Sequence, residues 1–515
     1  MRQTRNIQRA AIAATIGLAV TFAPPALAAT GTSSNALRSA VSADNIMTHL
    51  SALQAIADAN GGNRAAGTSG YEASAEYIEG QLEAAGYEPV RQVFTYEQYQ
   101  TVSASLQRLT PSTKEYAYGG DVDGFWDMEY SGEGDVTASV SAVDINLAGD
   151  RASTSGCEAA DFTGFPAGNI ALIQRGTCSF RIKADNAHAA GAVGVIIFNQ
   201  GNGAPGDDRD VLFSGTLGAP QADIPVVSTS FDTGAELAGL SNVSMRLAVD
   251  ATITQTSSFN ILADTGGRAD RTVVVGAHLD SVAEGAGIND NGSGTAAILE
   301  TAIQMSAAGV APTNRVRFAF WGGEEAGLIG SEYYVNQLTA RQIKEHAVNL
   351  NFDMVGSPNF VRFVYDGDGS AFGEKGPNGS ALVEKVFLDY FKSQNLPAVP
   401  TEFDGRSDYF GFINNGIPAG GLFTGAEGVK TAEEAAVFGG TAGEPYDPCY
   451  HAACDSIGTP GTDDNINVVV LEEMADAIAH STLTFAMTTS AVNGTSKGNG
   501  AGNVDLEYKA NKLLK

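Results

Sequence analysis

The sequence predicts an α/β protein, in which helices flank a mixed, largely parallel sheet and a β-rich module is inserted into the chain. Two observations lead to this fold class. From residue 258 onward, apolar runs typical of buried strands alternate with helical segments, as in repeated βα units. Between about residues 120 and 250, short β-type runs and turn residues dominate instead. The chain has 515 residues, more than one core usually spans, so two domains are expected.

Hydrophobic periodicity predicts the individual elements in order. Before the module we expect helices over 44–59 and 71–85 and a strand over 90–99. Within it we expect a helix over 182–190 and strands over 140–145, 170–174, 193–199, 224–228 and 243–249. After it we expect strands over 272–277, 315–321, 348–354 and 417–423, and helices over 295–306, 380–394 and 464–487. Sites in such sheets gather at the carboxyl ends of the strands.

The N-terminus has the pattern of a secretory signal peptide. Three arginines precede a short apolar run over residues 10–23, and Ala26-Leu27-Ala28 predicts cleavage after Ala28. The run is too short to span a bilayer, which disfavours a membrane anchor. We therefore expect a secreted, extracellular protein with a signal peptide over residues 1–28. The remaining expected parts are a discontinuous main domain of residues 36–119 and 251–487, an insert of residues 120–250 and a flexible tail of residues 488–515.

Charge and cysteine content limit the partners of this protein. The formal charge is −29 and no basic stripe is present, so nucleic-acid binding is not expected. No later segment is apolar enough to enter a membrane. The four cysteines form two local pairs, Cys157 with Cys178 and Cys449 with Cys454. An even count in an exported protein argues for disulfides, and the absence of CxxC spacing disfavours the alternative of thiolate zinc ligands.

Five short segments in the second half of the chain offer ligands for a metal. Three lie where strands are expected to end, and a fourth opens a helix. Zinc accepts imidazole and carboxylate, and a pair of zinc ions needs about five protein side chains, one of them shared. The set meets this need and leaves one carboxylate over as a base. The segments are Ala277-His278-Leu279-Asp280, Ile288-Asn289-Asp290-Asn291-Gly292, Trp321-Gly322-Gly323-Glu324-Glu325, Asn351-Phe352-Asp353-Met354 and Tyr450-His451.

The first segments suggest individual roles. His278 and Asp280 follow an expected strand on the same side, so the imidazole could bind zinc while the carboxylate supports it. Asp290 lies in a Gly-rich turn and is the candidate for the carboxylate that bridges two metals, although alone it would be read as a helix N-cap. Asp353 ends an apolar strand, where a carboxylate is costly to bury unless it is paired or metal-bound.

The other two segments add a base and a last ligand. Of the adjacent Glu324 and Glu325, one could bind zinc while its neighbour acts as general base, although paired carboxylates more often mark an exposed helix start. A disulfide around Tyr450 and His451 would hold both residues in one geometry. His451 could then bind zinc while the Tyr450 hydroxyl donates a hydrogen bond to a developing oxyanion. The alternative for that segment is a stapled surface loop. HExxH and Walker A motifs are absent.

These segments together resemble the two-zinc secreted aminopeptidase family that includes Streptomyces griseus aminopeptidase and yeast aminopeptidase Y. The resemblance implies a zinc-peptidase fold, two Zn²⁺ per chain and hydrolysis of the N-terminal bond of peptides with a free N-terminus. It also implies a preference for bulky apolar residues such as Leu. The matching motifs are AHLDSV (277–282), GINDNGSG (287–294), WGGEEAGLIGS (321–331), NFDMVGS (351–357) and CYHAACD (449–455).

The same resemblance assigns roles to single residues. It implies that Glu324 is the general base and that Arg406, in GRSDY (405–409), contacts substrate. The insert resembles a protease-associated domain at NIALIQRG (169–176), CSF (178–180) and AGAVGV (190–195). The remaining implied roles are His278 and Asp353 on the first zinc, Glu325 and His451 on the second, Asp290 as bridge, Asp280 in support of His278 and Tyr450 at the oxyanion.

Other functions remain open from the sequence. Carboxypeptidases and a glutaminyl cyclase are similar to this family, and a carboxypeptidase would need a cationic pocket, for which Arg406 is the one obvious candidate. A non-enzymatic binding protein is a third hypothesis, disfavoured because every expected ligand is present. Modulation by Ca²⁺ is a further expectation, to which Asp463 and Asp464 could contribute.

Overall fold

The computed structural model describes residues 33–119, 123–202, 209–458 and 464–488. The predicted signal peptide, Asp463 and the tail from residue 489 lie outside the described residues. The helices are α1 (Asn35–Arg38), α2 (Ala43–Ala59), α3 (Ser69–Ala84), α4 (Phe180–Ala189), α5 (Phe231–Gly239), α6 (Gly294–Ala307), α7 (Ile329–Asn336), α8 (Ala340–Glu345), α9 (Ser380–Ser393), α10 (Phe410–Asn414), α11 (Ala432–Phe438) and α12 (Val468–Met487). The strands are β1 (Val90–Thr110), β2 (Lys114–Tyr118), β3 (Gly124–Asp127), β4 (Gly134–Val143), β5 (Ile170–Gln174), β6 (Gly194–Phe198), β7 (Val226–Thr229), β8 (Ser244–Asp264), β9 (Arg268–His278), β10 (Asn314–Trp321), β11 (His346–Phe352), β12 (Phe363–Tyr365), β13 (Val399–Thr401) and β14 (Ala419–Phe423).

The larger lobe contains a mixed sheet in the order β8-β10-β9-β11-β14-β12-β13. Its central strands β10, β9, β11 and β14 are parallel to one another, whereas β8 and β12 join the sheet antiparallel. The predicted mixed, largely parallel sheet is confirmed. Because β9, β10 and β11 are parallel, their carboxyl ends lie at one edge of the sheet.

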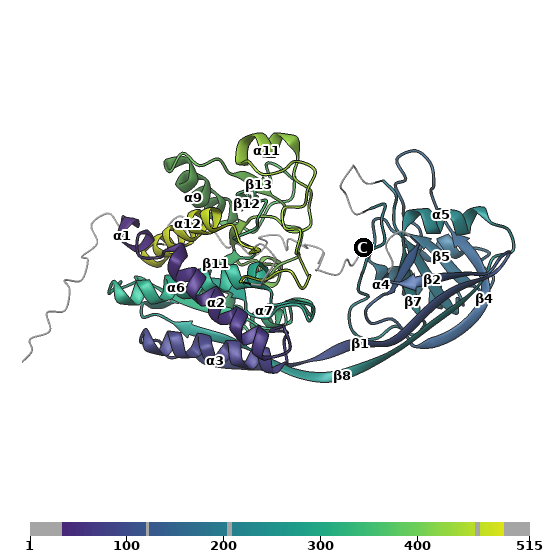
Figure 1. The fold of residues 1–515 in the computed structure, drawn as a ribbon, viewed down its shortest axis with the longest axis horizontal. Helices are drawn as coiled ribbons and strands as arrows, with labels where there is room; N and C mark the ends of the chain where they lie inside the picture. Colours follow the sequence, from purple (N-terminus) through teal and green to yellow (C-terminus); the bar gives the residue numbers. More distant parts are fainter. Residues whose placement is uncertain (1–32, 120–122, 203–208, 459–463, 489–515) are drawn as a thin grey trace, which may run out of the picture.

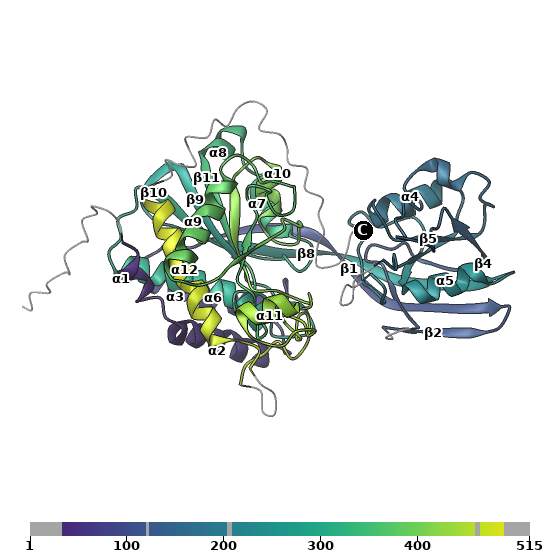
Figure 2. The same ribbon diagram turned by 90° about the horizontal axis from the view of Figure 1, so that it is seen from above.

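Helices cover both faces of this sheet (Figures 1 and 2). Apolar residues of α2, α3, α6, α9 and α12 form the main core with one face of the sheet. Alternate residues of the same strands, including Val274 and Trp321, pack on the other face against Tyr334 of α7 and Phe412 of α10. Side-chain caps fix where several helices begin, as Ser42 does for α2 by accepting a hydrogen bond from the Asn45 N–H.

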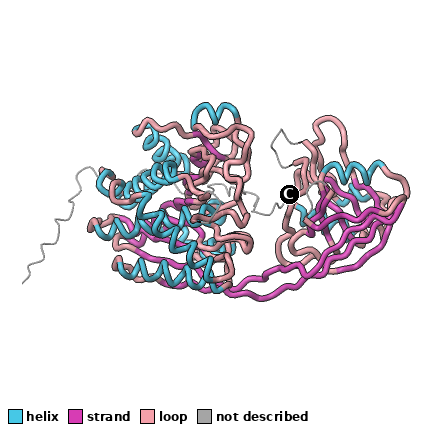
Figure 3. The backbone as a smooth tube through the Cα atoms, in the orientation of Figure 1, coloured by secondary structure: helices cyan, strands magenta, loops and turns pink. Residues whose placement is uncertain are grey.

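A long two-stranded ribbon joins the larger lobe to the β-rich lobe (Figure 3). Strands β1 and β8 pair antiparallel from Val90 opposite Leu262 to Thr110 opposite Ser244. The predicted strands over 90–99 and 243–249 were therefore too short, since β1 and β8 have 21 residues each. Much of the ribbon is partly or fully exposed and carries Gln, Thr and Ser, so hydrophobic alternation fades along it.

The β-rich lobe is built on the far ends of the ribbon. Strands β2 to β7 complete its sheet, and α4 and α5 pack beside the strands. Two clusters of buried residues fill it, separate from the core of the larger lobe. The disulfide Cys157–Cys178 lies in this lobe and confirms the predicted pairing. Among the described residues, no helix is long and apolar enough to cross a membrane.

Candidate metal centre

Three parallel strands deliver side chains to one edge of the sheet. His278 is the last residue of β9, and Asp353 directly follows β11. Glu324 lies three residues beyond the end of β10. Each follows a run of buried apolar residues, and all three are almost fully buried themselves. The expectation that these segments meet at the carboxyl ends of the strands is confirmed.

An irregular turn over Ile288–Ser293 presents Asp290 just before α6. The turn starts at Gly287, which has φ +60°, and a Cβ atom there would lie 2.3 Å from the carbonyl oxygen of Asp290. The backbone N–H groups of Asn289 and Asp290 donate to the two carboxylate oxygens of Asp455, at 2.8 and 3.0 Å. The chain is thus held so that the Asp290 side chain faces the strand ends.

The fifth segment is closed by the disulfide Cys449–Cys454, as predicted. His451 has a left-handed backbone, with φ +55°, and its ring stacks on that of Tyr450 with 3.8 Å between the centroids. The short covalent loop and the ring stacking together restrict the direction of the His451 imidazole.

Asp290 lies between the two histidines. Its Oδ1 is 3.3 Å from Nε2 of His278, and its Oδ2 is 3.2 Å from Nε2 of His451. Each histidine also has a second carboxylate within 3.3 Å of its Nε2. Asp353 Oδ1 is 3.3 Å from His278 Nε2, and Glu325 Oε2 is 3.1 Å from His451 Nε2. The five side chains therefore form two half-sites that share one carboxylate.

This donor set fits zinc. Its donors are imidazole nitrogens and carboxylate oxygens, which are the protein ligands that zinc accepts. The ligand atoms of His278, Asp290 and Glu325 lie within 4.8 Å of one another, as do those of His278, Glu324 and Asp353. Four carboxylates, with Asp280 nearby as a fifth, face only two imidazoles in this buried region. Buried charges are costly unless they are paired or bind metals, and dications would offset this excess of negative charge.

Glu324 has the environment of a group that exchanges protons. Burial raises its pKa well above the ordinary range, and the carboxylates of Glu325 and Asp353 raise it further, while His278 opposes the shift. Its Oε2 lies 3.9 Å from Nε2 of His278, so it borders the centre without the close approach of Asp290.

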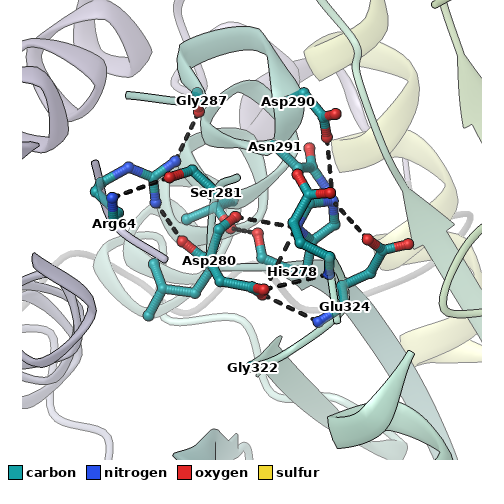
Figure 4. A network of polar contacts seen from close by, with 12 residues as sticks. Arg64, His278, Asp280, Ser281, Gly287, Asp290, Asn291, Gly322 and Glu324 are labelled. Atoms are coloured by element: carbon teal, nitrogen blue, oxygen red, sulfur yellow. Dashed lines mark hydrogen bonds and ion pairs between the residues drawn. The ribbon is translucent and has the colours of Figure 1, made fainter. Parts of the chain in front are cut away.

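Asp280 contacts the site mainly through backbone groups (Figure 4). Its carboxylate accepts hydrogen bonds from the N–H groups of Glu324 and Glu325, at 3.2 and 3.3 Å. Its Oδ1 is 3.8 Å from Nδ1 of His278, which lies 3.1 Å from the backbone oxygen of Asp280 instead. Asp280 therefore holds the Glu324–Glu325 segment against the end of β9.

A pocket adjoins the two half-sites and reaches Asp290 and Asp353. Arg406 lies in its wall, where its guanidinium donates to Glu427 Oε1 at 2.6 Å and to the Tyr450 oxygen at 3.1 Å. The other lining side chains include a group of apolar and aromatic residues, namely Met354, Phe363, Tyr365, Phe423 and Tyr446.

Several residues around the centre were missed from the sequence. Ser407 donates to Asp353 Oδ2 at 2.5 Å, and Asp455 anchors the Asp290 turn. Both lie inside motifs recognised above, so their position in the motif was a usable signal. Arg64 lies in a Gly-rich loop and is its only charged residue, and no local pattern links it to the site. The remaining histidines have partners elsewhere, namely Glu300 for His49, Asp223 for His188, Tyr334 for His346 and Ser34 for His480.

Replacement of Cys449 and Cys454 by serine should weaken zinc binding more than it weakens the fold. Opening so short a loop removes about 2 kcal/mol of unfolding free energy, but it also frees the backbone of His451. The matched control is the Cys157/Cys178 double serine variant, which opens a longer loop worth about 3 kcal/mol in the other lobe. The Cys449/Cys454 variant should therefore lose more zinc affinity than the control, whereas the control should unfold at the lower temperature. Equal zinc affinities would show that the loop does not orient His451.

Comparison with known proteins gives two family matches. Residues 260–482 match peptidase family M28, and residues 136–237 match the PA domain. An aminopeptidase of Pseudomonas aeruginosa is 48% identical over 454 residues, which cover 88% of this chain and 82% of the relative. Leucine aminopeptidase 2 of Trichophyton tonsurans is 37% identical, with 87% and 85% covered. The solved structure of a zinc aminopeptidase from Bacillus subtilis superposes with a TM-score of 0.59 at 25% identity, over 87% of this chain and 96% of that one.

Proposed function

The chain belongs to peptidase family M28 and carries an inserted PA domain, and on that basis we propose that it is a secreted aminopeptidase that uses two zinc ions. The observation that carries the proposal is the position of Asp290, whose two oxygens each face a different histidine. A shared carboxylate of this kind is what a pair of metal ions about 3.5–4 Å apart requires. The signal-peptide pattern and the two disulfides support export.

The half-sites suggest which residues hold each ion. His278 and Asp353 would hold the first zinc, His451 and Glu325 the second, and Asp290 would bridge them. When bound, the two zinc ions would polarise the substrate carbonyl and make the attacking water more acidic. The Bacillus relative is described as a zinc enzyme, which supports this choice of metal.

Glu324 moves the proton in this proposal. It accepts a proton from the water that attacks the first peptide carbonyl and returns the proton to the leaving amine. Burial and the neighbouring carboxylates raise the pKa of Glu324, which suits a group that must retain a proton between two steps. Asp280 holds the backbone of Glu324 through the hydrogen bond to its N–H.

Tyr450 would stabilise the carbonyl oxygen as it becomes negative. Arg406 donates to the Tyr450 oxygen, which orients the phenol and favours its role as a donor. We expect Tyr450→Phe to lower kcat by about 10²-fold with little change in KM, because the lost hydrogen bond forms only in the transition state. Steady-state kinetics on an amino-acid anilide measures both constants. A rise in KM at unchanged kcat would assign Tyr450 to substrate binding instead.

The pocket suggests the substrate side chain. Its apolar and aromatic lining favours a bulky apolar N-terminal residue such as Leu, in line with the name of the Trichophyton relative. A carboxypeptidase would need a cation for the substrate carboxylate. The charge of Arg406 is already paired with Glu427, which disfavours that alternative. The described residues do not group Asp464 with other acids, and modulation by Ca²⁺ stays a prediction.

Three hydrolysis substrates and one cyclisation substrate, a peptide with an N-terminal Gln, test the proposal. Leucine 4-nitroanilide offers a free amine, its N-acetyl form lacks the amine, and an N-blocked dipeptide offers only a free C-terminus. We expect hydrolysis of the first alone, and loss of it on chelation. Cleavage of the blocked dipeptide would indicate a carboxypeptidase, cyclisation of an N-terminal Gln peptide would indicate a cyclase, and inactivity on all of them would indicate a binding protein.

A further inference from the structure

Arg64 is a buried cation that reaches three backbone carbonyl groups at the edge of the metal centre. It lies in the loop between α2 and α3, and it is fully buried. Its Nε donates to the Ala286 oxygen at 2.8 Å and its Nη2 to the Gly287 oxygen at 2.6 Å. Its Nη1 donates to the Leu279 oxygen. The planar fork of the guanidinium makes such divergent bonds possible.

These carbonyl groups belong to the two segments that carry proposed zinc ligands (Figure 4). Leu279 follows His278 and precedes Asp280, at the end of β9. Gly287 starts the turn that presents Asp290, and its carbonyl also accepts the N–H of Gly292 at 3.0 Å. Arg64 thus connects the end of the strand to the start of the turn.

The Arg64 backbone is tied to the same region. Its N–H donates to Ser281 Oγ at 2.9 Å, and the Ser281 hydroxyl in turn donates to the Gly285 oxygen at 3.0 Å. Gly287 packs against the guanidinium so closely that a Cβ atom there would lie 3.2 Å from Nη2. The arginine therefore fills the space between the two segments as well as bonding to both.

The charge of Arg64 acts on carboxylates that it does not pair with directly. No ion pair among the described residues includes Arg64, although Asp280, Asp290, Glu325 and Asp455 lie near enough to act on it. Burial lowers its pKa to about 10 and these carboxylates oppose the shift, so the group stays charged at neutral pH. A buried charge is costly, and the four nearby carboxylates offset part of that cost.

We propose that Arg64 is a positioning residue for the metal centre, which fixes the His278–Asp280 strand end relative to the Asp290 turn and adds a positive charge behind the ligands. The inference rests on the proposed zinc function. Groups that orient metal ligands from outside typically contribute about 10–100-fold to metal affinity or activity. Arg64 would act through the backbone of the ligand segments, without touching the substrate.

Two substitutions separate geometry from charge. Arg64→Lys keeps the charge but loses the planar fork, and Arg64→Met loses both at similar length. The matched controls are Arg362→Lys and Arg362→Met, because Arg362 is also buried in the larger lobe but pairs with Glu473. The readouts are the unfolding temperature of the zinc-free proteins, the zinc dissociation constant by competition with a chromophoric chelator, and kcat and KM on leucine 4-nitroanilide.

We expect Arg64→Met to weaken zinc binding and lower kcat by about 10–100-fold at unchanged KM, with partial rescue in Arg64→Lys. The Arg362 variants should unfold at lower temperature and bind zinc as the unaltered protein does. The proposal is overturned if the Arg64 variants lose only thermal stability, as the controls do, or if neither of them folds. Failure of the unaltered protein to bind zinc would instead contradict the proposed function.

Discussion

Glu324→Gln should retain its fold and its zinc and lose about 10²–10⁴-fold in kcat, the range that a positioned general acid or base supplies. The amide has nearly the same shape as the carboxylate, but it cannot accept the proton of the attacking water. Glu324 borders the centre at 3.9 Å from His278 Nε2, farther than the proposed ligands, so zinc content should not change. Metal analysis and steady-state kinetics on leucine 4-nitroanilide measure the two quantities separately.

The control for this variant is Glu300→Gln. Glu300 is another buried glutamate, on α6, and it contacts His49 and Asn45 away from the centre. Its substitution should lower the unfolding temperature and leave kcat unchanged. Near-normal turnover in Glu324→Gln would remove Glu324 from the base role, and loss of zinc in that variant would make it a ligand.

Asp290→Asn should reduce binding at both half-sites. Asn keeps the size of Asp but cannot offer two anionic oxygens to two ions, so both ions lose a ligand. Activity should fall by more than about 100-fold, since loss of a direct ligand exceeds the effect of groups outside the ligand shell. Zinc stoichiometry and affinity, measured by competition with a chelator, check the result.

Asp353→Asn is the matched comparison within the site. Of the two histidines at the centre, Asp353 approaches His278 and not His451, so its loss should weaken one zinc and leave the other bound. If Asp290→Asn and Asp353→Asn lose the same single ion, Asp290 is an ordinary ligand of one half-site and the shared-carboxylate arrangement is wrong.

Much of the larger lobe could be predicted because its signals are local. The strands that end at His278 and Asp353 are continuous apolar runs, and parallel βα units bring such ends to one edge of a sheet. Helices such as α2 and α9 follow amphipathic periodicity and were predicted within one residue of their observed ends.

The parts that could not be predicted depend on contacts between distant residues. The ribbon of β1 and β8 is stabilised by pairing across about 150 residues of sequence, while its exposed, polar faces carry little periodic signal. Arg64 donates hydrogen bonds to backbone carbonyl groups more than 200 residues away. Because every residue has a backbone carbonyl group, the sequence does not indicate which of them Arg64 contacts. Asp280 was predicted to support His278, and it does lie at the site. Its hydrogen bonds to the Glu324 and Glu325 backbone could not be predicted, because the fold brings these distant segments together.

The central claim is that a pair of zinc ions shared by Asp290 serves an aminopeptidase reaction, and a zinc titration of the metal-free protein tests it most directly. Hydrolysis of leucine 4-nitroanilide would be followed as zinc is added, with the N-acetyl substrate and the Asp290→Asn variant in parallel. We predict that activity on the free amine rises until about two equivalents are bound, as a two-metal site requires, and that neither parallel reaction gains activity. Full activity in the metal-free protein, a plateau at one equivalent, or hydrolysis of the acetylated substrate would contradict the account.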